Sequence, residues 1–566
     1  MNQGVFVDRI WLKQYPAGVP SEVDPSIYAS LKELFESACH RHAGKPAFTN
    51  MNATLSYSQL DELSRAFAAW LTQKAGLAPG DRVALMLPNV LQYPVALFGA
   101  LRAGLVVVNT NPLYTATELE HQLADSGAKA IVILENFAHV LEKVLPKTEI
   151  KHVLVTGVGD LLGFPRGFIV NMVLRHVRKQ VAAWNIPKAL RFKNALAAGL
   201  GLQWEPPTVG PEDIAFLQYT GGTTGVSKGA ILTHRNMVVN VLQAGAILAG
   251  DAHEHEPPVV VTALPMYHIF SLTVNALLFA HLGGRNLLIT NPRDFPGFVA
   301  ELRKYKFHFI SGVNTLYNAL LHTPGFETLD FSHLRMSLGG GMAVQGTVAA
   351  HWKKVTGCVL TQGWGLTETS PVVSANPPGL DFNGSIGVPL PSTDIAVADD
   401  AGNALGVNEV GELCVRGPQV MRGYWNRPDE TAKVLMGGEW LRTGDIGRMD
   451  AQGFFYIEDR KKDMIIVSGF NVYPNEVESV AVEHPGVLEV AAVSQPDERA
   501  GEVVALFVVK KDPALTAESL IEHCRKQLTN YKVPRHVYFR TELPKTNVGK
   551  ILRRTLRDEL LAASKH

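Results

Sequence analysis

Short apolar runs of β type alternate with helical patterns through the first half of this chain. The run 82–87 precedes a helical pattern at 90–103, and the run 130–134 precedes another at 137–145, before a further strand-like run at 152–156. Such alternation builds parallel sheets flanked by helices, because each crossover helix covers a face of the sheet. We therefore predict an α/β fold here, with further strands at 259–263 and 307–312.

Size and a change of pattern indicate more than one folding unit. At 566 residues the chain exceeds the length at which a single hydrophobic core stops growing. The region 384–456 is rich in glycine, proline and β-branched residues, with a turn-like segment at 399–402, which predicts a β-rich subdomain. A charged run at 458–463 follows this region and indicates a hinge or a boundary.

The part beyond the charged run resembles a compact α+β unit of about a hundred residues. Strand-like runs stand at 464–467, 488–493 and 503–509, and Thr516 is placed to cap a helix that runs to about residue 528. We predict a large multi-lobed domain over 1–461, with mixed and parallel sheets flanked by helices. A small, mobile α+β domain is expected over 462–566.

Composition limits the partners and the location of the chain. Lysine and arginine total 53 against 53 aspartates and glutamates, so no overall field favours nucleic acid as a partner. The four cysteines lack zinc or disulfide spacing and residues 1–16 lack a signal-peptide core, which favours a reducing, cytoplasmic setting. The stretch 257–284 has no charged residue, but proline, histidine and asparagine interrupt it, which favours a buried segment over a membrane span.

A loop rich in glycine and threonine carries the strongest chemical signal. It follows the apolar run 214–217 and reads YTGGTTGVSKGA over 219–230. Glycines permit close backbone approach, and hydroxyls around one lysine match a polyphosphate, although a flexible surface loop is the rival interpretation. It is not a Walker A motif, because Ser227 and Gly229 flank the lysine. The candidate ATP-binding residues of the loop are Thr220, Gly221, Gly222, Thr223, Thr224, Gly225 and Lys228.

This loop resembles the phosphate-binding loop of the adenylate-forming superfamily of acyl-CoA synthetases, luciferases and peptide-synthetase adenylation domains. Segments resembling the other motifs of that family follow in its order: PMYHIF at 265–270, GWGLTET at 363–369, LRTGD at 441–445, DRKKD at 459–463, SGFNVYP at 468–474 and PKTNVGK at 544–550. Within the superfamily the sequence most resembles bacterial long-chain fatty-acid CoA ligases. Trp364 and Thr361 stand where tyrosine and an acidic residue are commoner, which puts the fine geometry around adenine in question.

The resemblance implies a role for each matched residue. Lys550 becomes the catalytic lysine, Glu368 and Thr223 serve catalysis and Mg2+ binding, and Lys462 is the hinge. Further ATP contacts are expected at Gly340, Gly341, Gly363, Trp364, Gly365, Thr367, Asp445 and Arg460. Coenzyme A contacts are expected at Ser468, Gly469 and Phe470, and acyl contacts at Tyr267, His268, Gly312, Val313 and Gly339.

Elementary chemistry is consistent with these roles. A carboxylate that attacks an α-phosphate brings two anions together, so catalysis depends on positioning and charge neutralisation. Glu368 offers the hard oxygen that Mg2+ prefers, and Lys550 offers a compact, mobile cation. Taken alone, Lys550 is an ordinary surface lysine, and His268 is balanced between a core histidine and a gate of the acyl entrance. A small domain that pivots near Lys462 lets Lys550 enter for adenylation and leave for thioester formation.

We therefore predict an enzyme that converts a long-chain fatty acid, ATP and coenzyme A into acyl-CoA, AMP and diphosphate through an acyl adenylate. Such an enzyme feeds fatty-acid degradation or lipid synthesis. The alternatives are a ligase for medium-chain or aryl acids and an acyl-AMP ligase that loads a carrier protein. A non-enzymatic acyl or nucleotide sensor is disfavoured, because Thr223, Glu368, Asp445 and Lys550 are all present. The sequence leaves a homodimer open.

A basic amphipathic helix is predicted over 170–181. Its apolar face comprises Val170, Val173, Leu174, Val177 and Val181, and its polar face comprises Asn171, Arg175, Arg178 and Lys179. Helices of this kind can lie in the headgroup layer of anionic membranes, so the segment is a candidate for peripheral docking at the inner membrane face. The rival interpretation is an ordinary surface helix whose apolar stripe packs on the large domain.

Overall fold

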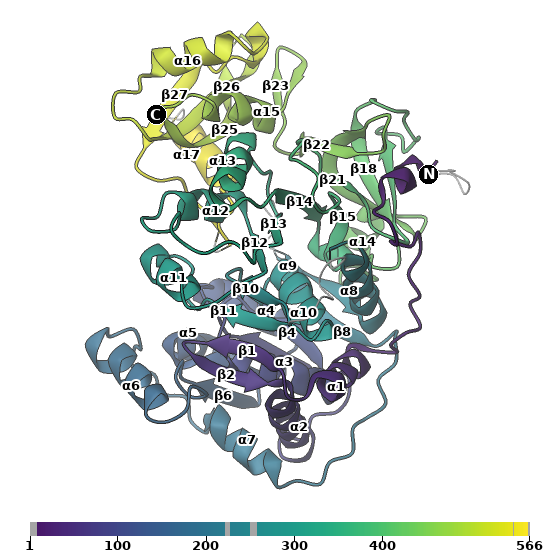
Figure 1. The fold of residues 1–566 in the computed structure, drawn as a ribbon, viewed down its shortest axis with the longest axis vertical. Helices are drawn as coiled ribbons and strands as arrows, with labels where there is room; N and C mark the ends of the chain where they lie inside the picture. Colours follow the sequence, from purple (N-terminus) through teal and green to yellow (C-terminus); the bar gives the residue numbers. More distant parts are fainter. Residues whose placement is uncertain (1–7, 221–226, 249–256, 498, 547, 564–566) are drawn as a thin grey trace.

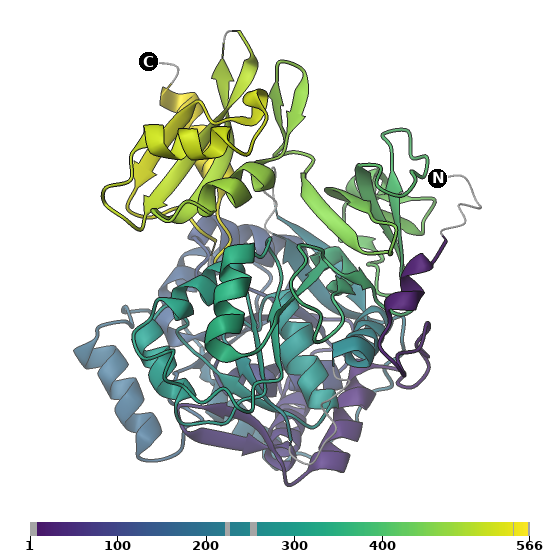
Figure 2. The ribbon, with the colours of Figure 1, turned by 45° about the horizontal axis from the view of Figure 1, so that its top comes forward.

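The computed structural model of the chain describes residues 8–220, 227–248, 257–497, 499–546 and 548–563. Two large sheets and their helices form the main body, coloured purple to teal in Figure 1. A β-rich unit lies beside this body, and a small C-terminal α+β unit lies over it (Figure 2). This arrangement confirms the predicted fold class.

The first large sheet has eight strands, most of them parallel. The predicted strands at 130–134 and 152–156 coincide with two of them, because parallel strands buried on both faces are continuous apolar runs. In spatial order the strands are β19 (Gly423–Tyr424), β9 (Lys228–Thr233), β8 (Ile214–Thr220), β4 (Val106–Asn109), β3 (Arg82–Met86), β5 (Ala130–Leu134), β6 (His152–Thr156) and β7 (Leu190–Arg191). At one edge of this sheet, β9 pairs antiparallel with both β8 and β19.

The second large sheet has nine strands with a parallel centre. Antiparallel pairs close both of its ends. In spatial order the strands are β16 (Val388–Pro389), β15 (Val372–Ala375), β14 (Leu360–Gly365), β13 (Met336–Gly339), β12 (Phe309–Gly312), β10 (Val259–Thr262), β11 (Arg285–Leu288), β1 (Pro46–Asn50) and β2 (Ala53–Ser56). The carboxyl ends of β13 and β14 carry the glycine-rich segments that resemble nucleotide contacts.

One apolar core joins the two large sheets. It includes Leu85 of the first sheet, Val260 of the second and the helix α3 (Gln92–Arg102), every residue of which is buried. The other helices are α1 (Leu31–His42), α2 (Tyr57–Gln73), α4 (Ala116–Ser126), α5 (Ala138–Val144), α6 (Arg166–Met172), α7 (Phe192–Leu200), α8 (His234–Leu248), α9 (Ile269–Ser271), α10 (Leu278–His281), α11 (Phe295–Leu302), α12 (Asn314–Leu321), α13 (Gly346–Thr356), α14 (Pro428–Val434), α15 (Pro474–Val482), α16 (Ala517–Arg525) and α17 (Arg553–Ala563).

Two smaller sheets complete the fold. The β-rich unit contains β17 (Asp394–Ala398), β18 (Gly411–Arg416), β20 (Leu435–Met436), β21 (Trp440–Met449) and β22 (Phe455–Arg460). The C-terminal unit contains β23 (Ile465–Val467), β24 (Phe470–Val472), β25 (Val487–Asp497), β26 (Gly501–Lys510) and β27 (His536–Arg540). The chain passes from one sheet to the other between Arg460 and Ile465, and Thr516 caps α16 as expected.

The uncharged stretch 257–284 lies mostly inside the large body. It forms β10, α9, the π-helical turn Leu272–Leu277 and α10, and its aliphatic side chains are buried in the core. No helix in the described part of the chain has the length and apolarity that crossing a membrane requires. The prediction that this stretch is a buried segment is therefore confirmed.

The predicted amphipathic helix differs from the observed one. Helix α6 begins at Arg166 and continues as a π-helical segment only to Val177, so Val181 lies beyond its end. Val170 and Leu174 are half-buried against the main core, but Val177 is exposed. Arg175, which was placed on the polar face, pairs with the buried carboxylate of Glu135. The extent of the helix and its apolar face were therefore predicted wrongly.

Candidate active site

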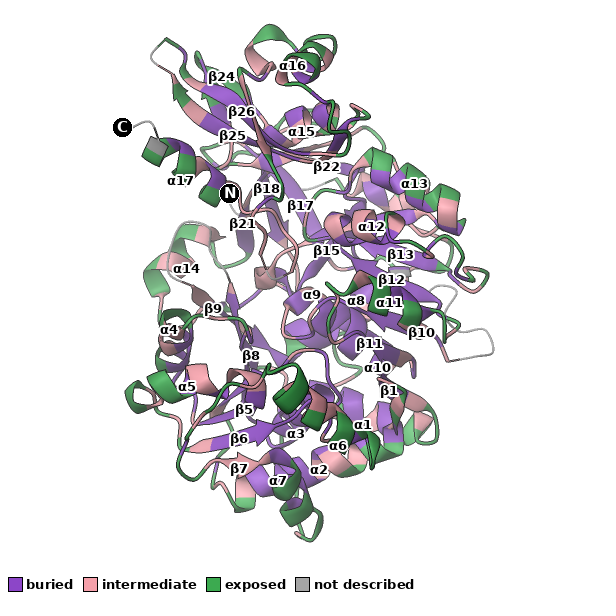
Figure 3. Cartoon of the chain, turned by 90° about the vertical axis from the view of Figure 1, so that its left-hand side faces the viewer, coloured by how far each residue is buried: buried purple, intermediate pink, exposed green. Residues whose placement is uncertain are grey.

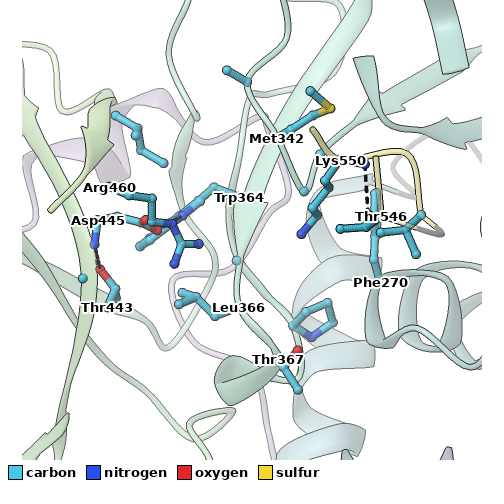
Figure 4. A pocket seen from close by; sticks show the side chains of 18 of the residues that line it. Phe270, Met342, Trp364, Leu366, Thr367, Thr443, Asp445, Arg460, Thr546 and Lys550 are labelled. Carbon is cyan, nitrogen blue, oxygen red and sulfur yellow. Dashed lines mark hydrogen bonds and ion pairs between the residues drawn. The ribbon is translucent and has the colours of Figure 1, made fainter. Parts of the chain in front are cut away.

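A cleft with a volume of about 1980 Å³ lies where the large body, the β-rich unit and the C-terminal unit meet. Elements far apart in the sequence line it, including β14, β21 and the loop before α17. In Figure 4, Phe270 and Lys550 lie on one side of this cleft, and Asp445 with Arg460 lies on the other. Trp364 lies between the two sides.

Lys550 enters the cleft from the C-terminal unit. Its backbone N–H donates to Thr546 Oγ1 at 3.1 Å, and the N–H of Thr546 donates back to the Lys550 carbonyl at 2.7 Å. The large body contacts the same loop, because Thr315 Oγ1 on α12 donates to the Gly549 carbonyl at 2.9 Å. Gly341 has a φ of +77°, which favours glycine. A Cβ there would also lie only 3.3 Å from Lys550 Cε, so a larger residue would crowd the lysine.

Three charged side chains lie close enough to Lys550 to change its pKa: Arg460, Asp445 and Glu368. Burial lowers the pKa of its ammonium group to about 8, the nearby Arg460 adds to this, and Asp445 with Glu368 opposes it. The protonated form is therefore sensitive to pH close to neutrality. A lysine so placed is a cation at neutral pH that adds charge where an anion develops.

Asp445 of β21 is buried, and each of its carboxylate oxygens has one protein partner. One carboxylate oxygen pairs with Arg460 Nε at 2.5 Å, and the other accepts from Trp364 Nε1 at 2.8 Å. Burial raises the pKa of Asp445, although the Arg460 cation and the Trp364 hydrogen bond act in the opposite direction. The short β21–β22 pairing sets this geometry, since Asp445 lies opposite Arg460 in its register.

Glu368 lies on a short 3₁₀ turn, Thr367–Thr369, held by the edge of the first sheet. Its Oε1 accepts from Tyr424 Oη at 2.7 Å, and its carbonyl accepts from the N–H of Met421. Lys228 Nζ lies 5.0 Å from the centre of the same tyrosine ring. Tyr424 therefore connects the candidate metal ligand with the lysine of the phosphate loop.

Lys228 has an acidic partner that the sequence did not reveal. Its Nζ pairs with Glu430 Oε2 on α14 at 2.6 Å, and Lys433 pairs with the other oxygen of that carboxylate. These two cations lower the pKa of Glu430 to about 2, so Glu430 is charged at neutral pH. An anion that reaches Lys228 must compete with Glu430 for it.

The structure brings most of the remaining candidate residues to the cleft. Thr220, at the end of β8, and Lys228 line it, whereas Gly221, Gly222, Thr223, Thr224 and Gly225 lie outside the described residues. A side chain at Gly365 would meet the Pro371 carbonyl at 1.8 Å, so only glycine fits there. Further lining residues are Gly340, Gly341, Gly363, Trp364, Gly365, Thr367, Lys462, Tyr267 and His268.

His268 both caps a helix and faces the cleft. Its Nδ1 accepts from the N–H of Phe270 at 3.3 Å at the start of α9. Enclosure and the Lys550 cation lower the pKa of its imidazole to about 3. The ring is therefore neutral at physiological pH and presents an uncharged edge beside the apolar side chains of Ile269 and Phe270.

Six predicted contacts lie away from this cleft. Gly312, Val313 and Gly339 lie behind its wall at the ends of β12 and β13, where a Cβ at Gly339 would meet Val344 at 2.7 Å. Ser468, Gly469 and Phe470 lie on the β23–β24 hairpin of the C-terminal unit and do not line the cleft. The Phe470 ring is 56% exposed and stacks on Tyr531.

A buried polar network ties the C-terminal unit to the end of β22. Arg553 of α17 donates to Asp459, Asn475 and Glu478, and the N–H of Asn475 donates to Asp459 at 2.7 Å. Burial raises the pKa of Asp459 to about 6, which the Arg553 cation opposes. Lys462, the predicted hinge, follows directly, and burial lowers the pKa of its ammonium group.

Sequence reasoning missed Thr315, Tyr424 and Glu430. None belongs to a motif that resembles the family, and each acts on a residue at least 56 positions away. The only available signal was the pattern RGY at 422–424 before a helix start, which alone says nothing about its partner. Acidic and basic side chains line the cleft in equal number, and the cations Lys228, Arg460, Lys462 and Lys550 among them are groups that bind a polyanion.

Comparison with known families places the two parts of the chain. Residues 35–425 match the family described as AMP-binding enzyme, and residues 476–550 match the AMP-binding enzyme C-terminal domain. A long-chain-fatty-acid–CoA ligase of Escherichia coli O157:H7 is 59% identical over 552 residues, which is 97% of this chain and 98% of that protein. A 4-coumarate-CoA ligase 2 of Narcissus pseudonarcissus is 32% identical over 521 residues, covering 90% and 88%.

A solved structure has the same architecture. The crystal structure of ATP-bound MatB from Rhodopseudomonas palustris superposes with a TM-score of 0.81 at 27% identity and covers 94% of this chain and 99% of its own. Its likeness extends over both units of the fold. The chain thus resembles a protein solved with ATP bound over 94% of its length.

Proposed function

The chain belongs to the AMP-binding enzyme family, and we propose that it is an AMP-forming long-chain fatty-acid–CoA ligase. The observation that carries this proposal is the convergence of Lys228, Glu368, Asp445 and Lys550 in one cleft from four separate elements. Cations and carboxylates in this combination suit a nucleoside triphosphate and an attacking carboxylate. The 59% identity with a long-chain-fatty-acid–CoA ligase over nearly the whole chain supports the choice of substrates.

In the first step the fatty carboxylate attacks the α-phosphorus of ATP, the bond to the β-phosphate oxygen breaks, and diphosphate leaves. Lys550 places its cation between the two anionic groups. Lys228 leaves Glu430 for the phosphates, and Thr220 with the loop that follows supplies further donors. Asp445 accepts from the ribose hydroxyls, and Arg460 restrains its carboxylate.

Magnesium fits the residues present, and Thr223 and Glu368 are its proposed protein ligands. Mg2+ usually binds one or two carboxylates together with substrate phosphates, so a single carboxylate beside a phosphate loop suffices. In the described part of the chain no group of three or more acidic, histidine or cysteine side chains forms a ready-made metal cage, which agrees with a metal that arrives with ATP. When bound, Mg2+ neutralises phosphate charge. Tyr424 restrains the Glu368 carboxylate through its hydrogen bond to Oε1.

In the second step the thiolate of coenzyme A attacks the acyl carbonyl carbon, and AMP leaves with the bonding electron pair. Lys550 occupies the space that this attack requires. We propose that the unit from residue 462 onward rotates about Lys462, which withdraws Lys550 and brings Ser468, Gly469 and Phe470 to the thiol path. Their present distance from the cleft and the exposure of the Phe470 ring support a second arrangement of this kind.

A small apolar cavity of about 20 Å³ lies next to the cleft and marks the direction in which the acyl chain is proposed to extend. Leu338 lines both the main cleft and this cavity, which is bounded by Val260, Val274, Phe279 and Met336. Gly312 and Gly339 lie at the ends of the strands that separate the two. An acid with a long chain extends past Tyr267 and His268 in this direction and widens the cavity as it binds.

The test of this proposal measures AMP release and thioester formation with acids of increasing chain length, with and without coenzyme A. Long-chain acids are expected to give acyl-CoA with the highest kcat/KM. A preference for aryl or medium-chain acids would assign the chain to the alternative CoA ligases. Release of AMP without consumption of free coenzyme A would instead indicate an acyl-AMP ligase that loads a carrier protein.

The cysteines support a reducing, cytoplasmic location. Cys39, Cys358, Cys414 and Cys524 are all buried free thiols. Burial raises the pKa of each, which keeps them as unreactive thiols rather than thiolates. In such a compartment the product acyl-CoA is available to fatty-acid degradation or to lipid synthesis.

A further inference from the structure

Exposed apolar side chains are concentrated on one short segment of the surface. Of the thirteen large hydrophobic residues that are exposed in the described part of the chain, five lie within the fourteen residues 164–177. Phe164 is 91% exposed, Phe168 65% and Val177 70%, and the remaining two are Ile169 and Met172. Figure 3 shows this helix as a largely exposed element at the surface of the large body. A patch of this kind on a monomer marks an interaction site.

The segment turns only part of its apolar surface toward the protein, since Val170 and Leu174 pack on the core while its aromatic side chains are exposed. Its small and polar residues face the protein: a Cβ at Gly167 would lie 2.1 Å from the Gly159 carbonyl oxygen. Asn171 accepts from the N–H of Gly159 at 2.7 Å and donates to Asp160 at 2.8 Å. One turn further, Arg175 donates to the buried Glu135. These contacts fix the helix with its aromatic face outward, so the exposure is built into the fold.

The charged residues in the sequence around this exposed apolar face are all basic. From residue 161 to residue 204 the chain contains no aspartate or glutamate. Seven cations stand in the same stretch, of which Arg175 and Arg191 pair with Glu135. The other five are exposed: Arg166, Arg178, Lys179, Lys188 and Lys193. An apolar face within a basic rim complements a surface that is anionic outside and apolar beneath.

We propose that α6 and its π-helical extension, Val173–Val177, dock the protein reversibly on an anionic lipid bilayer, with Phe164, Phe168, Ile169 and Met172 inserted among the acyl chains. A helix that lies in the headgroup layer buries its apolar face about 5–10 Å deep while its cations remain with the lipid phosphates. A second copy of the same face fits poorly, because it brings one basic rim against another. The inference deepens the proposed function, since long-chain acids partition into bilayers.

Co-sedimentation with vesicles tests the docking without any catalytic step. Full-length protein is mixed with vesicles of phosphatidylglycerol and phosphatidylcholine, and with vesicles of phosphatidylcholine alone. Wild type should bind the anionic vesicles in a salt-sensitive way and the zwitterionic vesicles weakly. The triple variant Phe168→Ser, Ile169→Ser, Met172→Ser should lose at least about tenfold in partitioning. The matched control Val407→Ser, Val410→Ser, which removes two exposed valines from the β-rich unit, should bind as wild type.

The basic rim is tested separately. Each cation near an anionic membrane contributes about fivefold to binding, so Arg178→Gln, Lys179→Gln, Lys188→Gln should weaken binding to anionic vesicles on the order of 100-fold at low salt. Binding to phosphatidylcholine vesicles should change little. Circular dichroism and turnover of a short, water-soluble acid check that each variant is folded, so a failure of docking and a failure of the proposed ligase activity are observed independently.

A variant that keeps the apolar face tests docking without the risk that a loss of binding reflects misfolding. Phe164→Trp places a fluorophore at the most exposed position, and lipids brominated along the acyl chain should quench it on binding. Absence of additional quenching, or unchanged sedimentation of the serine triple variant, overturns the proposal. So does a serine variant that changes a dimer into a monomer in solution while vesicle binding persists, because the face is then a protein interface.

Discussion

Thr315 offers a way to separate the two half-reactions without touching the reacting groups. Its hydroxyl on α12 donates to the Gly549 carbonyl at 2.9 Å, and this is a contact from the large body to the loop that carries Lys550. Gly549 has a φ of +87°, so the loop conformation is sharply defined at this point. We expect Thr315→Val to weaken the arrangement in which Lys550 is inserted and to leave the arrangement for thioester formation unaffected.

The magnitude follows from the hydrogen bond and its surroundings. A neutral hydrogen bond contributes about 1 kcal/mol net, and a carbonyl left unsatisfied in a partly buried site costs about 1–3 kcal/mol. Because the site is only partly buried, the lower part of this range applies, and a loss of about 1–2 kcal/mol corresponds to a fall of about 5- to 30-fold in kcat/KM for adenylation. Valine keeps the shape of threonine, so the packing of α12 is preserved. Thr315→Ser retains the hydroxyl and is expected to stay within about twofold of wild type.

Two assays separate the outcomes. Exchange of labelled diphosphate into ATP in the presence of fatty acid reports adenylation, and acyl-CoA formation from supplied acyl adenylate reports the second step. The expected result is a selective loss in the first assay. Equal losses in both, or a serine variant as poor as the valine variant, would refute the idea that this hydroxyl acts by holding the Lys550 loop.

Three further outcomes are expected. Lys550→Ala should abolish adenylation while thioester formation from supplied acyl adenylate persists; equal loss of both steps would contradict the two-arrangement account. Tyr424→Phe should raise the Mg2+ concentration needed for half-maximal adenylation, as should Glu368→Gln with a larger effect, and a Mg2+ titration identical to wild type in either variant removes that residue from the metal site. Because burial lowers the pKa of Lys550 to about 8, its cation is lost as pH rises through that value, so adenylation should fall on the alkaline side and Lys550→Arg should move the fall to higher pH.

The strands that could be predicted best are those whose boundaries coincide with their apolar runs. β5 and β6 are buried on both faces, so the sequence changes character where the strands end. β25 extends to Asp497, well beyond the predicted end at residue 493, because it continues into a tight antiparallel pairing with β26. Polar residues there satisfy their backbone hydrogen bonds in the hairpin, and hydrophobicity does not report this.

The charged run at 458–463 shows the same limit. It indicated a boundary, yet its first three residues belong to β22, and Asp459 is buried there because Arg553 and Asn475 satisfy its carboxylate. A run of charged residues indicates that each side chain is either hydrated or paired with another protein group, but it does not show which of the two applies. The apolar face of the helix at 166–177 was predicted wrongly for a related reason. The close contact between Gly159 and Gly167 determines which face packs on the protein, and the spacing of the valines does not show this contact.

The candidate site divides in a similar way. Lys550, Asp445 and Glu368 could be named from motifs that resemble a family. Only the tertiary structure shows that they lie in the same site. Thr315, Tyr424 and Glu430 belong to no such motif and act through pairings of 234, 56 and 202 residues in sequence separation. A single sequence contains no signal for pairings of this length, because neither periodicity nor spacing extends across separate elements.

Two contacts of the C-terminal unit differ in their place relative to the proposed pivot, and this decides which of the two distinguishes the half-reactions. A rotation about the 461–464 connection displaces each atom in proportion to its distance from that connection. Asp459 lies immediately before the connection, so its bonds to Arg553 and Asn475 change least and stabilise the junction in both arrangements. The Thr315–Gly549 contact lies at the tip of the Lys550 loop and separates when the loop leaves the cleft. Selectivity for adenylation therefore resides at the tip, whereas damage at the junction impairs both steps.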